Sequence, residues 1–101
     1  MIQYITYKGE KLPVRLGYYA LKHTKIDTGK EFVDINTDTI DYDVLECGLY
    51  YSLVQGYKFE GKKCPYEKTD MEEILDECLF QFIEVIANFI PKAGGEGSKK
   101  K

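Results

Sequence analysis

The chain has 101 residues, which is enough for one domain with one modest hydrophobic core. Apolar residues make up 44% and charged residues 31%, the balance of a globular protein rather than a disordered one. The formal net charge is −3, and subtracting the three terminal lysine charges leaves −6 for residues 1–98. Nucleic acid is therefore not expected as a partner, because its binding rests on clustered Lys and Arg.

The cysteines and the hydropathy pattern indicate a cytoplasmic protein without a membrane partner. Cys47, Cys64 and Cys78 are odd in number and show no C-x-x-C spacing, and no signal-peptide pattern opens the chain. The most apolar stretch, residues 79–90, is interrupted by polar side chains and is shorter than a membrane span. We therefore expect reduced thiols and a cytoplasmic location.

The N-terminal residues predict a β-hairpin. Residues 2–7 are rich in β-branched and aromatic side chains, and residues 11–15 alternate apolar with polar side chains. Between them, residues 8–10 form a short turn centred on glycine. Pro13 cannot donate to a β-ladder, so the second strand should lie at an edge.

Two helices are expected in the middle of the chain. The first covers residues 17–28, with Gly29 at its C-terminal cap. The second covers about residues 41–56, with Asp41 as its N-cap. Gly48 inside this helix costs roughly 1 kcal/mol relative to Ala. A close helix crossing is the commoner reason for such a glycine and a functional feature the other, and the sequence does not decide between them. The connection between the two helices has no clear element, but its apolar residues should be buried: Phe32, Val33 and Ile35.

A long helix is expected at the C-terminus. Thr69 and Glu72 have the spacing of a capping box, and Pro91 should stop the helix at about Ile90. We therefore expect a single domain over residues 1–91 and a flexible Gly- and Lys-rich tail over residues 92–101. The predicted fold class is α+β, an N-terminal β-hairpin packed on about three helices, of which the C-terminal one is longest.

The apolar stripe of the C-terminal helix covers about half of its circumference. Such a width has two explanations: the helix lies at the centre of the domain and is covered on two sides, or part of it contacts a second chain. The candidate residues for protein contact or self-association are Leu79, Phe80, Phe82, Ile83, Ile86 and Phe89.

No catalytic, cofactor or metal site is predicted. His23 is the only histidine and has no evident nucleophile as a partner, which argues against a hydrolase triad. Residues 34–38 resemble the opening of a calcium loop, but Thr39 and Leu45 stand where such a loop needs glycine and glutamate. No glycine-rich phosphate loop is present. A metal-dependent enzyme using the acidic residues of 34–43 is the weakest alternative.

The nine tyrosines are the other notable feature. Tyrosine is enriched in protein interfaces, because it buries a large area with little loss of entropy and keeps a hydroxyl that can pair. Tyrosine is equally common as a half-buried residue in a small core. The sequence does not decide between these two explanations.

The order of these segments resembles the tail assembly chaperones of long-tailed bacteriophages and prophages. The resemblance lies in residues 7–17, where a short strand, a turn and a second strand lead into a helix. It continues in the 41–56 helix with its Cys47-Gly48-Leu49-Tyr50 run, and in the 69–90 helix, which has acidic residues first and aromatic residues later.

The resemblance implies a small non-catalytic protein that binds the tail tape measure protein during tail morphogenesis and keeps its apolar helices soluble. It also implies a longer form made by a −1 ribosomal frameshift, for which a run of adenines encoding Lys99, Lys100 and Lys101 would be suited. Self-association (a homo-oligomer) is expected on a separate ground, because so small a core gains stability from it. The alternative is a small acidic adaptor or regulator of another pathway that dimerises through the same helix.

Overall fold

The computed structural model describes the backbone of residues 2–30 and 41–94, and the side chains within these ranges up to Phe89. Across these residues an antiparallel β-hairpin precedes three α-helices, the last of which is the longest, so the predicted α+β class is confirmed. The expectations for Phe32, Val33 and Ile35, and for the tail beyond Gly94, lie outside the described residues.

The hairpin joins β1 (Gln3–Tyr7) to β2 (Glu10–Val14) with Tyr7 opposite Glu10. Lys8 and Gly9 form the connection and have φ angles of 52° and 80°. A two-residue turn of type I′ needs positive φ at both positions, and glycine adopts it without strain. The predicted hairpin is confirmed.

One face of the hairpin supplies the core. Ile5 and Tyr7 of β1 are buried together with Leu12 and Val14 of β2, whereas Tyr4 is about half exposed. These residues follow the alternation that a strand with one buried face requires. The hairpin therefore needs helices against this face in order to be stable.

The first two helices begin where the sequence predicts. Helix α1 (Tyr18–Thr28) ends at Gly29, whose φ of 75° is the left-handed conformation of a helix C-cap. Helix α2 (Tyr42–Phe59) is capped by Asp41, whose carboxylate accepts a hydrogen bond from the Val44 amide at 3.2 Å. Both predicted caps are confirmed.

The predicted end of α2 at Gly56 is wrong by three residues. Gly56 is buried inside the helix, and its carbonyl accepts a hydrogen bond from the Glu60 amide. The left-handed residue that ends the helix is Gly61, with a φ of 77° and its amide bonded to the Lys58 carbonyl. Residues 57–59, expected in a loop, therefore belong to α2.

The predicted capping box of Thr69 and Glu72 is also wrong. A 3-10 turn, η2 (Lys68–Asp70), leads directly into α3 (Met71–Gly94). The reciprocal bonding occurs two residues earlier, where the Asp70 carboxylate accepts from the Glu67 amide at 2.8 Å. The sequence holds two overlapping cap patterns here, and the earlier one is used.

Helix α3 does not stop before Pro91 but continues to Gly94. Proline removes one hydrogen bond from a helix interior and is therefore a frequent helix end, yet it is tolerated where the remaining bonds hold the turn. The first three residues of the predicted flexible tail, 92–94, thus belong to α3.

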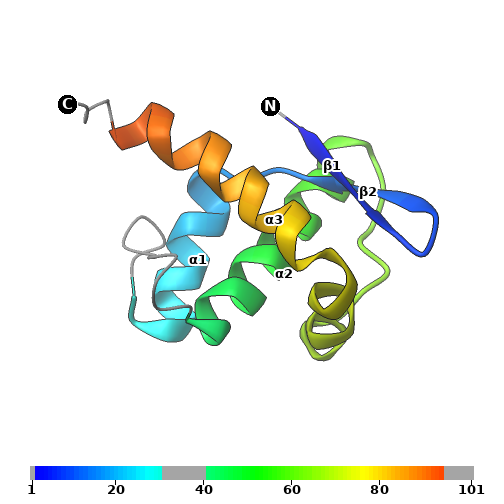
Figure 1. Ribbon diagram of the computed structural model, residues 1–101, viewed down its shortest axis with the longest axis horizontal. Helices are drawn as coiled ribbons and strands as arrows, with labels where there is room; N and C mark the ends of the chain where they lie inside the picture. The colour runs from blue at the N-terminus through cyan, green and yellow to red at the C-terminus, as the bar shows by residue number, and fades with distance from the viewer. Residues whose placement is uncertain (1, 31–40, 95–101) are drawn as a thin grey trace.

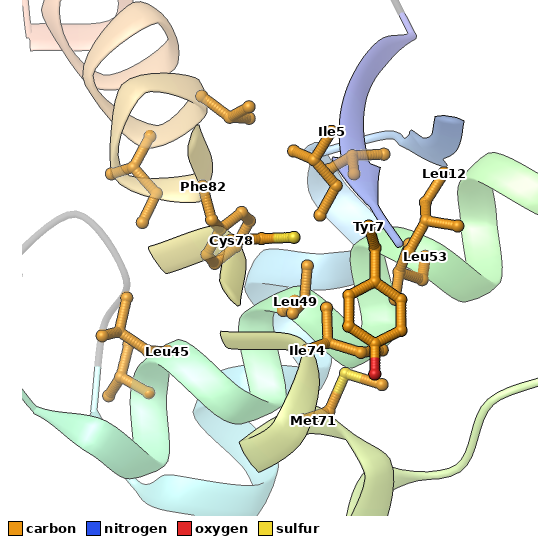
Figure 2. Close-up of a cluster of buried hydrophobic side chains, with 14 residues drawn as sticks. Ile5, Tyr7, Leu12, Leu45, Leu49, Leu53, Met71, Ile74, Cys78 and Phe82 are labelled. Atoms are coloured by element: carbon orange, nitrogen blue, oxygen red, sulfur yellow. The ribbon is translucent and has the colours of Figure 1, made fainter. Parts of the chain in front are cut away.

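Helix α2 occupies the centre of the fold. It packs against α1, against β2 and against α3, while α3 also packs against β1 (Figure 1). Figure 2 shows Cys78 and Phe82 of α3 pointing toward Leu49 of α2 and toward the hairpin residues. The C-terminal helix is therefore a covering element, and the expectation that it could be the central helix is not met.

Side chains of α3 bind the backbone of the hairpin. The Gln81 side chain accepts from the Thr6 amide at 2.7 Å and donates to the Thr6 carbonyl at 3.0 Å. The Glu77 carboxylate accepts from the Lys8 amide at 2.8 Å, and the Cys78 thiol donates to the Thr6 carbonyl at 3.1 Å. These bonds fix the position of α3 along β1.

Candidate protein-contact surface

Helix α3 has one buried face and one exposed face. The buried face supplies Met71, Ile74, Cys78, Phe82, Val85 and Ile86 to the core. Their spacing follows the helical repeat, which places them on one side. Phe80 lies on the other side and is 81% exposed, the largest exposed fraction among the big apolar side chains described.

The structure divides the six residues predicted for protein contact into three groups. Phe82 and Ile86 are 0% and 5% exposed and belong to the core, so a partner cannot reach them in the folded domain. Phe89 is half-buried and lies two turns after Phe82, on the same side of the helix. The remaining three are accessible and stand together: Leu79, Phe80 and Ile83.

We call Leu79, Phe80 and Ile83 the outer α3 face. Ile83 is three residues from Phe80 and four from Leu79, so the three side chains are neighbours on the helix surface. Leu79 packs partly against the core, and Ile83 is half-buried. The three side chains form a contiguous apolar surface, in which Phe80 is the most exposed. Helix α3 itself lies at the surface of the fold (Figure 1).

Carboxylates surround the outer α3 face. Glu72, Asp76 and Glu84 are exposed, and we call them the acidic rim. Asp76 and Glu84 are each four residues from Phe80, and Glu72 is four residues from Asp76, so the rim runs along the same side of the helix. Within the described ranges, no cation lies within ion-pair distance of these three carboxylates.

The negative charge extends onto α2. Burial raises the pKa of the Glu46 carboxyl, and the nearby charges of Glu72 and Asp43 raise that pKa further. A carboxylate responds in this way when like charges stand close to it. Glu46 and Asp43 near the start of α2 therefore add negative charge near Glu72, the first carboxylate of the rim.

A second group of polar and aromatic side chains joins α1, α2 and η2. The His23 ring lies 4.2 Å from the Tyr19 ring and 5.1 Å from the Tyr51 ring, measured between centroids. The Lys68 ammonium lies 5.1 Å from the Tyr51 centroid, within the range of a cation–π contact. Asp27 accepts hydrogen bonds from Lys68 and, at 2.5 Å, from the Tyr51 hydroxyl.

The charges in this group stabilise one another. Hydrogen bonds from Lys68 and Tyr51 lower the pKa of the Asp27 carboxyl, and the bond to Asp27 raises the pKa of Lys68. Burial, followed by the bond to Asp27, raises the pKa of the Tyr51 hydroxyl. These directions favour an ionised Asp27 and a protonated Tyr51, the state of a structural contact rather than of a general base near neutral pH.

Thiols and possible metal ligands are the remaining side chains with a potential for chemistry. Cys47, Cys64 and Cys78 are all free, and burial raises the pKa of each thiol, which disfavours the nucleophilic thiolate. Among the described residues, no three side chains of metal-binding type gather into a possible site. Of the acidic cluster considered for metal binding, Asp41 serves as the α2 cap and pairs with Lys30, while Asp34 and Asp38 lie outside the described residues.

The tyrosines differ widely in their burial. Tyr18 and Tyr42 are exposed, and Tyr7 is buried in the core. Tyr57 is half-buried, and burial raises its pKa to about 12. The aromatic group of α1 and α2 was not predicted, because it depends on how these two helices cross.

Comparisons of the chain with protein-family models, with curated proteins and with solved structures found no match. The resemblance to tail assembly chaperones therefore stays a prediction. In residues 2–30 and 41–94, no helix is long and apolar enough to cross a membrane.

Proposed function

We propose that this protein is a non-catalytic binding protein, a tail assembly chaperone that binds the tape measure protein of a phage or prophage in the bacterial cytoplasm. The bound segment is an apolar helix of the partner, held reversibly against the outer α3 face. The observation that carries the proposal is Phe80: an 81% exposed phenylalanine on a helix whose opposite face is fully used in the core.

Three features support this reading. The outer α3 face places Phe80 beside Ile83 and Leu79, so the exposed apolar area is contiguous rather than scattered. Aromatic side chains supply much of the binding energy in protein interfaces, and an amphipathic helix is the usual ligand of an apolar helix surface. The thiols of the domain, in addition, have pKa values that disfavour a nucleophile.

Co-expression tests the proposal. A candidate tape measure protein is produced with the wild-type chain, with the double variant Phe80→Ser/Ile83→Ser, or alone, and its soluble fraction is measured. We expect the wild type to raise the soluble fraction and the double variant to lose this effect. Tyr18→Ser is the matched control, because Tyr18 is also an exposed aromatic residue (78%) but lies on α1.

The control variant should act like the wild type. A tape measure protein that is equally insoluble with and without the chain would refute the chaperone function. Full activity of the double variant would instead refute the assignment of the outer α3 face. Circular dichroism of each purified variant verifies that the fold is retained.

A further inference from the structure

We infer that the segment recognised by the outer α3 face is an amphipathic helix whose apolar seam is flanked by lysine or arginine. The inference rests on the proposed binding function and adds the chemistry of the partner. It rests on the acidic rim, because apolar contact alone does not explain why carboxylates lie next to the outer α3 face.

The acidic rim lies one helical turn from the apolar contact residues of α3. A helix packed on Phe80 and Ile83 brings its own flanking residues over the neighbouring positions of α3, one turn away. Those positions hold Asp76 and Glu84. The residues that flank the partner's seam therefore face carboxylates at both ends of the contact.

The carboxylates of the rim differ from other carboxylates of the domain in their pairing. Within the described ranges, Glu72, Asp76 and Glu84 have no ion pair, whereas Asp27 and Asp41 each pair with a lysine. Among the described residues, these three carboxylates therefore do not stabilise the fold through ion pairs. Its charges are available to a second molecule, and like charges on that molecule would be repelled.

Further negative charge lies close to the acidic rim. Glu46 of α2 lies close enough to Glu72 and to Asp43 for their charges to act on it, so the negative charge of the rim extends from Glu72 toward α2. The sequence as a whole is acidic, with a formal charge of −3. Opposite charge on a partner speeds its association and selects it over neutral or acidic helices of equal apolarity.

The test uses two designed helical peptides of about 20 residues, long enough to be helical in part on their own. Both carry the same leucine and alanine seam, and the flanking positions are lysine in one and glutamate in the other. Binding to the full-length chain is measured by fluorescence anisotropy at about 50 mM and about 500 mM salt, which span strong to weak screening. We expect the lysine peptide to bind about tenfold tighter at low salt, with most of the difference lost at high salt.

Charge reversal locates the effect. The double variant Asp76→Lys/Glu84→Lys should reverse the preference, so that the glutamate peptide binds tighter. The control Glu10→Lys/Glu60→Lys changes net charge by the same amount through exposed residues of β2 and the end of α2, away from the outer α3 face. It should keep the preference for the lysine peptide.

The failures of the two proposals can be told apart. Equal binding of both peptides, lost in Phe80→Ser, would overturn the basic partner and leave the docking face standing. Binding of neither peptide, or binding that Phe80→Ser leaves intact, would overturn both. A concentration-dependent dimer that Phe80→Ser abolishes would show a second copy on this face, and the basic partner would again be overturned.

Discussion

Gly56 of α2 lies directly against the backbone of Pro13 in β2. A Cβ atom placed on Gly56 would stand 2.2 Å from the Pro13 carbonyl oxygen and 2.5 Å from the Pro13 carbonyl carbon. The clash is with backbone, which cannot rotate away as a flexible side chain can. The contact between α2 and the hairpin therefore depends on the absence of a side chain at position 56.

Gly56→Ala should accordingly destabilise the domain, although alanine favours a helix more than glycine does. The expected loss is about 2–4 kcal/mol in the free energy of unfolding, because α2 and β2 must separate to admit the methyl group. Urea unfolding followed by circular dichroism measures the loss. Gly17→Ala is the control, since nothing lies within 4 Å of its added Cβ; because Gly17 is the N-cap of α1, it should cost at most about 1 kcal/mol. An equal effect of the two substitutions would contradict the close approach.

Two phenylalanines of α3 should respond in opposite ways to truncation. Phe82→Ala should cost about 3–5 kcal/mol, because Phe82 is fully buried and leaves a cavity. Phe80→Ala should change stability by less than about 0.5 kcal/mol, because that ring is in contact mainly with solvent. Chemical denaturation of both variants tests this contrast, and a large loss for Phe80→Ala would mean that the ring is covered.

The group formed by Asp27, Lys68 and Tyr51 predicts a dependence of stability on pH. Bonds from Lys68 and Tyr51 lower the Asp27 pKa in the folded state, so their contribution is fully present above the unfolded value of about 3.9. It is lost as the pH falls through the folded pKa. Asp27→Asn should therefore destabilise by about 1 kcal/mol at most at pH 7, and by less near pH 2.5.

The check is a series of urea unfolding curves for the wild type and Asp27→Asn across this pH range. The two free energies should converge at low pH. Asp76→Asn serves as the comparison, because Asp76 is exposed and has no ion pair among the described residues. A gap for Asp27→Asn that stays constant with pH would argue against the pairing.

Gln81 should protect one amide of the hairpin from exchange with solvent. Its side chain makes two hydrogen bonds to the Thr6 backbone, each of which contributes about 1 kcal/mol. Gln81→Ala should raise the hydrogen-exchange rate of the Thr6 amide several-fold, measured by NMR. The Leu12 amide, in the other strand, should change less, and equal acceleration of both would indicate general loosening instead.

Local patterns were sufficient to predict much of the fold. The hairpin turn, the Asp41 cap and the Gly29 cap each depend on a few adjacent residues, and all three occur as expected. The error at the start of α3 arose because two local cap patterns overlap there, whereas the error at Gly56 has a long-range cause. Gly56 has the sequence context of a helix end, yet it is glycine because of Pro13, 43 positions away, which only the folded structure brings near.

The candidate surface was predictable only in part, because it also depends on tertiary packing. The wide apolar stripe of α3 includes both buried and exposed side chains, and the pattern gives Phe82 and Phe80 similar weight. Their difference in exposure depends on which side of α3 meets β1 and α2, and that is a property of the tertiary packing. The exposed carboxylates around Phe80 have meaning as a rim only once that side is known.

The bonds from Gln81 and Glu77 to the Thr6 and Lys8 backbone also affect the tendency of the hairpin to pair with other chains. They occupy the outward backbone groups of Thr6 and the Lys8 amide, while Pro13 removes one outward donor from β2. A two-stranded sheet with open edges would invite extended segments to add a third strand and would promote aggregation. Each of these features leaves fewer free backbone groups on the hairpin, and therefore lowers its tendency to pair with an extended chain.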